Sequence, residues 1–94
     1  MFTTTTLQLD EEYQFLEISD SLVDCTILFT LKTENRVPFD FAIVDGRTLD
    51  ENDFIKVYTG YMSATVRNIK KLTLIVLRAY QPCKVEIKIR TLAV

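Results

Sequence analysis

Four carboxylates lie close together in one polar stretch, and their spacing could support acid–base chemistry or the binding of a cation. They are Asp45, Asp50, Glu51 and Asp53. Acid–base catalysis near neutral pH most often uses a histidine, and the chain has none. A calcium loop needs acidic side chains at alternate positions and a final glutamate, an order that this stretch lacks. We therefore expect a solvated loop, no metal or other cofactor, and no enzyme.

The two cysteines, Cys25 and Cys83, each fall in phase with the apolar positions of a predicted strand. Without histidine they cannot complete a four-ligand zinc site. The N-terminus has neither a basic region nor an apolar region of the kind that forms a secretory signal, so we expect reduced, buried thiols. A disulfide stays open as an alternative, because two strand starts on one inner surface could bring the two Cα atoms within about 7 Å.

Cations and tyrosines are interleaved in the second half of the chain, as in small barrels that bind single-stranded nucleic acid by stacking and phosphate contacts. The set is Lys56, Tyr58, Tyr61, Arg67, Lys70, Lys71, Arg78 and Tyr80. A pI of about 5.0 argues against a nucleic-acid partner, and the absence of tryptophan removes the favoured platform for sugars. A small module that binds single-stranded nucleic acid or glycan is therefore the alternative interpretation.

The charge is divided along the chain. Residues 1–53 carry twelve Asp/Glu and three Lys/Arg, a balance of −9, whereas residues 54–94 carry eight Lys/Arg and one Glu, a balance of +7. One interpretation is that strands from the two halves interleave, so that the charges neighbour one another and nearly cancel. The other is a molecule with an acidic and a basic surface, suited to stacking on copies of itself or on a charged partner.

Alternation of apolar and polar residues predicts strands throughout, with turns at polar or glycine-containing segments. No run of eighteen apolar residues occurs, so no membrane span is expected. The length of 94 residues predicts one domain over residues 1–94. The expected strands are residues 3–9, 13–18, 25–33, 37–44, 54–59, 61–68, 72–80 and 83–90. This spacing predicts an all-β fold, a small antiparallel β-sandwich that is jelly-roll-like or immunoglobulin-like, with a small β-barrel as the alternative.

The last two predicted strands are the ones around which we expect the rest of the chain to pack. Residues 83–90 alternate without a fault, with Val85, Ile87 and Ile89 on one side, and residues 72–80 are apolar on both sides. With Gln81 and Pro82 as the turn, we expect a hairpin over residues 72–90 whose outer face is basic. Its expected covering layer consists of Ile27, Phe29, Leu31, Phe39 and Phe41.

The threonine-rich start of the chain favours an extended backbone and offers little apolar area, which is typical of an edge strand. Residues 1–9 are therefore expected to form an edge strand or an arm that can add to a neighbouring chain, with a frayed end over residues 1–6 as the alternative.

These features predict a non-enzymatic structural or interaction protein that assembles with copies of itself or with a larger particle. We expect a small, capsid-associated component of a virus or phage virion, located in the virion or the cytoplasm, by analogy of fold and size. The residues expected to bind partners are Thr3, Thr5, Lys70, Lys71, Arg78, Lys84, Lys88 and Arg90.

Overall fold

Eight strands and two short 3₁₀ turns make up the part of the chain that the computed structural model describes, which is residues 2–18, 26–45, 51–67 and 73–92. No α-helix occurs in these ranges, and none of their helical segments is long and apolar enough to span a membrane. The elements in chain order are β1 (Phe2–Leu9), β2 (Gln14–Glu17), β3 (Thr26–Thr33), η1 (Glu34–Arg36), β4 (Phe39–Asp45), η2 (Glu51–Asp53), β5 (Ile55–Val57), β6 (Tyr61–Val66), β7 (Thr73–Ala79) and β8 (Cys83–Leu92).

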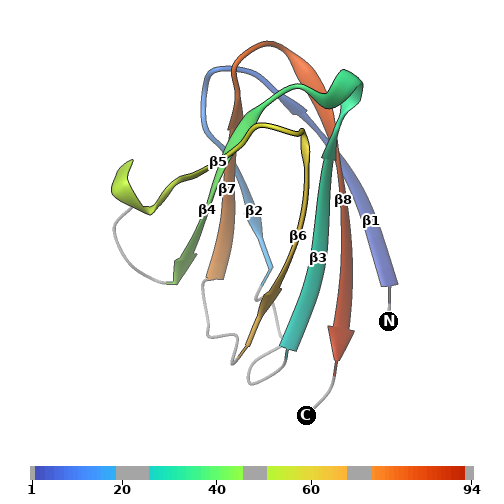
Figure 1. Cartoon of the computed structure of the whole chain (residues 1–94). Helices are drawn as coiled ribbons and strands as arrows, with labels where there is room; N and C mark the ends of the chain where they lie inside the picture. Colours follow the sequence, from blue (N-terminus) through green and yellow to red (C-terminus); the bar gives the residue numbers. More distant parts are fainter. Residues whose placement is uncertain (1, 19–25, 46–50, 68–72, 93–94) are drawn as a thin grey trace.

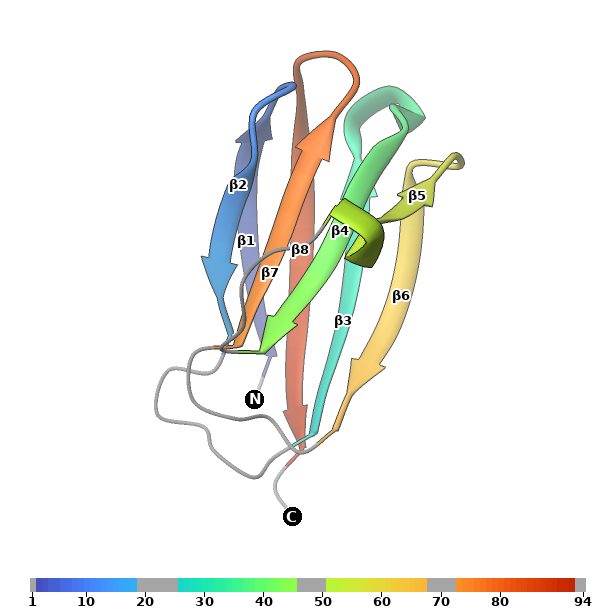
Figure 2. The same cartoon turned by 90° about the vertical axis from the view of Figure 1, so that its left-hand side faces the viewer.

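The strands form two antiparallel four-stranded sheets that pack face to face, which confirms the predicted all-β sandwich. Sheet A has the order β1-β8-β3-β6, and sheet B has the order β2-β7-β4-β5. Figure 1 shows the two layers side by side, and Figure 2 looks onto sheet B with sheet A behind it. Each sheet ends in two edge strands, so the alternative of a closed barrel is wrong.

The strand order is that of a jelly roll rather than of an immunoglobulin domain. The first strand pairs with the eighth, the second with the seventh, the third with the sixth and the fourth with the fifth. The chain is therefore one long hairpin that has been rolled up, so that β3 also pairs with β8 and β4 with β7. Immunoglobulin sheets instead pair the first two strands with each other, which this fold does not do.

The predicted hairpin over residues 72–90 is wrong. β7 is a central strand of sheet B and β8 is a central strand of sheet A, so the chain crosses from one sheet to the other between them. Residues 81 and 82 are Gln and Pro, which do not supply the positive φ that a tight hairpin turn requires. The inward alternation of β8 is confirmed, because Val85 and Ile87 are fully buried.

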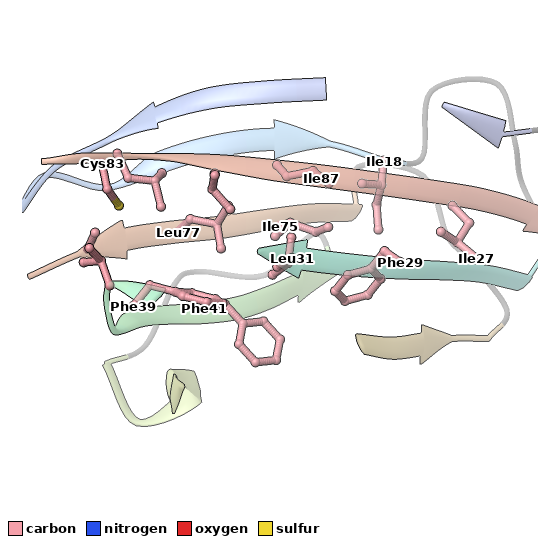
Figure 3. Close-up of a cluster of buried hydrophobic side chains, with 14 residues drawn as sticks. Ile18, Ile27, Phe29, Leu31, Phe39, Phe41, Ile75, Leu77, Cys83 and Ile87 are labelled. Atoms are coloured by element: carbon pink, nitrogen blue, oxygen red, sulfur yellow. The ribbon is translucent and has the colours of Figure 1, made fainter. Parts of the chain in front are cut away.

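The core lies between the two sheets, where apolar side chains from β3 and β8 meet those from β4 and β7 (Figure 3). Phe29 from sheet A and Phe41 from sheet B contact each other edge to face, with ring centroids 6.5 Å apart. The five residues that were expected to cover the hairpin together are therefore divided between the two sheets. Phe39 and Phe41 share sheet B with β7, whereas Ile27, Phe29 and Leu31 share sheet A with β8.

A tight contact joins the β3–β4 connection to the β5–β6 connection at one end of the sandwich. The backbone N–H of Thr33 donates to the Gly60 carbonyl at 2.8 Å, and the Thr33 hydroxyl donates to the Val37 carbonyl at 2.7 Å. Gly60 has a φ of 71°, and Asn35 and Arg36 in η1 also have positive φ. The costly positive φ values of Asn35 and Arg36 are therefore held in place by a turn at Gly60, where glycine adopts its positive φ without that cost.

Candidate interaction surfaces

The four edge strands differ in how well they are protected against pairing with another chain. The edges of sheet B are short and charged: β2 has four residues including Glu17, and β5 has three including Lys56. The edges of sheet A are longer and uncharged, since β1 has the sequence FTTTTLQL and β6 has YMSATV. Charge and short length are the usual protection of an edge. Sheet A therefore exposes two edges without that protection.

β1 is an edge strand, as predicted, and it is paired along its whole length. The register with β8 runs without interruption from Phe2, opposite Arg90, to Leu9, opposite Cys83. The fraying considered for residues 1–6 therefore does not apply to residues 2–6. β1 ends the order of sheet A, so no strand in the described ranges pairs with its other side.

The threonines of β1 divide between two faces. Thr3 and Thr5, the two predicted contact residues, lie opposite Ile89 and Ile87 and so belong to the inward-facing row, where Thr5 is half-buried and Thr3 is exposed. Thr4 and Thr6 lie on the outer face and are both exposed. Sequence reasoning missed this second pair, although the phase of Leu7 and Leu9 in the same strand could have located it.

The outer face of sheet A is basic. Its outward side chains on β3 and β8 include Lys32, Lys84, Lys88 and Arg90, all exposed, against one carboxylate, Glu86. We call the outer surface of sheet A that carries these four cations the basic face. It contains three of the predicted contact residues, Lys84, Lys88 and Arg90, and the structure brings them together along one strand. Lys70 and Lys71 were also predicted to bind partners, but both lie outside the described residues.

Arg78 was expected near this surface, and that expectation is wrong. Arg78 lies on the outer face of sheet B, because β7 and β8 belong to different sheets. Its Nε–H donates to Asp40 Oδ2 at 3.2 Å, and this hydrogen bond raises the pKa of the Arg78 guanidinium above its ordinary value. The Asp40 carboxylate is buried and also accepts from the Tyr80 hydroxyl, at 2.8 and 2.9 Å to its two oxygens.

Two aromatic rings cover the outer face of sheet B. Tyr13, just before β2, stacks on Phe54, just before β5, with centroids 5.1 Å apart. Because β7 and β4 lie between β2 and β5, these rings meet above the central strands. Beneath them Val76 and Ala42 are buried although they point away from the core. Figure 1 shows the η2 turn, in yellow-green, on the same side of sheet B.

Two cations pack on the tyrosine rings of this outer face. We call the whole set, Tyr13, Phe54, Tyr58, Tyr80, Lys56 and Arg78, the aromatic cluster. The Lys56 Nζ lies 4.4 Å from the Tyr80 ring centroid and 5.1 Å from that of Tyr58, and the Arg78 guanidinium lies 5.0 Å from that of Tyr13. The interleaved cations and tyrosines noted in the sequence are thus partly internal partners of one another. The doubly apolar pattern of β7 was the signal that something had to cover its outer face.

Replacing Tyr80 by phenylalanine is expected to lower the free energy of unfolding by about 1–2 kcal/mol, because the buried Asp40 carboxylate loses its hydroxyl donor. Urea denaturation measures this change. Tyr58→Phe is the matched control, since Tyr58 is 72% exposed, and it is expected to change stability by less than about 0.5 kcal/mol. Equal effects of the two changes would contradict a structural role for the Tyr80 hydroxyl.

Strands from the two oppositely charged halves alternate in both sheets, as the first interpretation of the charge pattern predicts. β1 and β3 come from the acidic half, and β6 and β8 come from the basic half, yet all four form sheet A. On the outer face of sheet B, Glu17 and Asp40 balance Lys56 and Arg78. The basic face of sheet A carries an excess of positive charge in spite of this mixing.

The residues with a potential for catalysis are not gathered into a site in the described part of the chain. Cys83 is buried, and burial, with a smaller effect of Glu34, raises the pKa of its thiol, which therefore stays neutral near pH 7. Cys25 and Asp50 lie outside the described residues, while Asp53 is exposed in η2. Among the described residues no three Cys, Asp or Glu side chains gather in a way that could hold a metal ion.

In the described structure, the aromatic cluster covers the outer face of sheet B, and the basic face of sheet A is open. The edge strands β1 and β6 of sheet A lack the usual protection against pairing. No protein-family model matches the chain, and a search of curated proteins gives no significant match.

Proposed function

We propose that this chain is a non-enzymatic structural protein that assembles with copies of itself by pairing β1 with β1 of a second copy. The observation that carries the proposal is the β1 edge: eight residues, no charge, no proline, no glycine and an unbroken register with β8. Strand addition to such an edge satisfies its free backbone groups without any change in the fold.

Two-fold symmetry fits this edge better than head-to-tail addition. Two β1 strands related by a two-fold axis pair antiparallel, and the contact then closes on itself. The result is one continuous eight-stranded sheet built from two copies of sheet A. Pairing of β1 with β6 of the next copy would instead give rings or open filaments. The longer length of β1, eight residues against six, favours the first arrangement.

The larger assembly that we propose is a virus or phage particle. Eight-stranded jelly rolls form capsid domains, although they also occur in lectins and cupins. The support for this step is an analogy of fold. Self-pairing through a sheet edge would link neighbouring copies in such a particle.

Two substitutions separate the assembly contact from the fold. Thr6 lies opposite Glu86 on β8, and Thr4 lies opposite Lys88. Thr6→Lys and Thr4→Glu, made singly, each place a charge beside an opposite charge within the chain, which favours the fold. At a two-fold β1–β1 contact, however, both copies carry the same new charge on the same outer face, so the like charges repel each other across the contact. We expect each to raise the dimer dissociation constant at least about tenfold, a loss of about 1.4 kcal/mol.

Light scattering coupled to size-exclusion chromatography, over a wide concentration range, measures this change. Thr65→Lys on the β6 edge is the control and is expected to leave the dimer intact. Loss of assembly with Thr65→Lys as well would point to head-to-tail pairing of β1 with β6. The wild-type dimer should resist salt, because β1 has no charge. A wild-type chain that stays monomeric at every concentration would overturn the proposal.

A further inference from the structure

The basic face of sheet A is open, in contrast to the outer face of sheet B. Tyr13, Phe54 and Lys56 cover parts of sheet B, and its outward charges balance. On sheet A the outward side chains of the central strands carry four cations against one carboxylate. Since the whole chain has a net charge of −2, this face concentrates positive charge that the average conceals.

A shallow depression of about 670 Å³ lies on this face, over β3, β6 and β8. Three hydroxyl side chains, Thr30, Ser63 and Thr65, line it along β3 and β6. Lys88 and Arg90 line it along β8, where Lys88 lies opposite Thr30 across the sheet. Tyr61, opposite Lys32, lines its other side.

Glu86 also lines this depression, 3.7 Å from the Lys88 Nζ, so the lining carries three cations, Lys32, Lys88 and Arg90, against one carboxylate. The cations, the hydroxyl groups and the tyrosine each match one part of a nucleotide chain. Lysine, arginine and hydroxyl side chains are the usual contacts of phosphate oxygens. Tyr61 is 54% exposed and, unlike Tyr58 and Tyr80, has no cation packed on its ring in the described structure. An exposed aromatic ring beside cations on a sheet surface is a stacking platform for an unpaired base.

We propose that the basic face binds single-stranded nucleic acid, with Lys88, Arg90 and Lys32 at the phosphates and Tyr61 stacked on a base. A duplex fits this surface less well because its bases are already stacked and paired. An acidic polypeptide would use the cations but would gain little from Tyr61. The objection raised by the pI of about 5.0 applies to the whole chain, whereas the fold separates this face from the acidic turn at Asp10, Glu11 and Glu12.

Fluorescence anisotropy with a labelled oligo-dT of about twelve nucleotides tests the proposal on the full chain. Three phosphate contacts predict a slope of about −2 in a plot of log affinity against log salt, so the affinity should fall roughly 20-fold between 50 and 200 mM salt. Lys88→Glu/Arg90→Glu is expected to weaken binding at least about 30-fold at 50 mM salt and to flatten this slope.

Two matched controls carry the same changes on other surfaces. Arg36→Glu/Lys56→Glu alters the net charge equally, but Lys56 lies on sheet B and Arg36 in η1, so a change of less than about threefold is expected. Tyr61→Ala should weaken binding about 5- to 100-fold, and Tyr61→Phe should restore it, because stacking needs the ring and not the hydroxyl. Tyr58→Ala should have no effect. Circular dichroism and urea denaturation confirm that each variant is folded.

Three results would overturn the proposal. The first is no binding by the wild-type chain at 50 mM salt. The second is an equal loss in both charge-reversed pairs, which would mean attraction by net charge alone. The third is equal competition by poly-glutamate and by unlabelled oligo-dT, which would assign the face to acidic polypeptides.

The inference does not depend on the β1 contact, and the two can fail separately. Thr65 lines the depression, so Thr65→Lys would change the face and the β6 edge together. The β1 edge is therefore tested with Thr6→Lys, which should raise the dimer dissociation constant at least about tenfold yet leave a measurable affinity for oligo-dT. Lys88→Glu/Arg90→Glu should abolish oligo-dT binding yet leave dimers in light scattering. If binding disappears in both variants, the face acts only in the dimer and the single-chain site proposed here is wrong.

Discussion

Replacing Gly60 by alanine is expected to lower the free energy of unfolding by about 3 kcal/mol or more, since two separate costs add. The backbone at Gly60 has a φ of 71°, which a residue with a Cβ adopts only at a cost. The added Cβ would also lie 2.5 Å from the Arg36 Cα and 2.6 Å from the Thr33 hydroxyl. Because one of these atoms is backbone, η1 would have to move, and the hydrogen bonds of Thr33 would weaken.

Urea denaturation of Gly60→Ala and Gly60→Asn separates the two costs. Asparagine tolerates positive φ better than alanine does, but it has the same Cβ. If the close approach dominates, both variants should lose similar stability. Full recovery in Gly60→Asn would show that backbone conformation alone matters, and an unchanged midpoint for Gly60→Ala would contradict the tight contact. Ser63→Ala, on the exposed side of the following strand, is the control and should stay within about 0.5 kcal/mol.

Phe29→Ala is expected to cost about 3–5 kcal/mol, the range for removing a buried aromatic side chain. Phe29 is 1% exposed in the middle of β3 and reaches across the core to Phe41 in the opposite sheet. Removing its ring loses apolar burial and leaves a cavity that two hydrogen-bonded sheets cannot easily close. For a domain of this size the loss is a large part of the total stability.

The control is Phe15→Ala, the same substitution on an outward position of β2 where the ring is 57% exposed. We expect it to cost less than about 1 kcal/mol. A double-mutant cycle with Phe41→Ala should give a coupling of about 0.5–1.5 kcal/mol for the edge-to-face pair. A coupling of zero would mean that the two sheets do not meet at these rings.

The sequence was sufficient to predict which residues face the core. Strict alternation assigned Val85 and Ile87 to the inside of β8, and both are fully buried. Alternation holds in β6 as well, where Met62, Ala64 and Val66 pack against the core. Alternation shows on which face of the sheet a residue lies, because successive side chains of any strand point to opposite sides.

Strand partners could not be predicted in the same way. The alternation of residues 83–90 is the same whether β8 pairs with β7 or with β1 and β3, so proximity in the sequence suggested the wrong partner. The position of Arg78 was wrong for this reason, since its side chain follows β7 into sheet B. Pairings between residues far apart in the sequence depend on how the whole chain rolls up, and no local pattern records that.

The candidate surfaces were predicted in part. Lys84, Lys88 and Arg90 share a face, as their spacing of two or four residues requires. Thr3 and Thr5 were chosen for their residue type, but the phase of the strand places Thr4 and Thr6 outward instead. The aromatic cluster joins Tyr13 and Phe54 across four strands, so neither residue could be assigned to it from its neighbours in the sequence.

The pairing of the first strand with the last has a consequence for biosynthesis. Phe2 pairs with Arg90, so β1 leaves the ribosome roughly 5–20 s before its partner at ordinary rates of synthesis. Sheet A cannot form its central pairings until β8 arrives, because β8 lies between β1 and β3. The sandwich can therefore close only late, after β8 has left the ribosome. Until then, β1 has no strand from its own sheet on either side. The β8 of each nascent chain must therefore pair with its own β1 before a strand from another chain pairs with it.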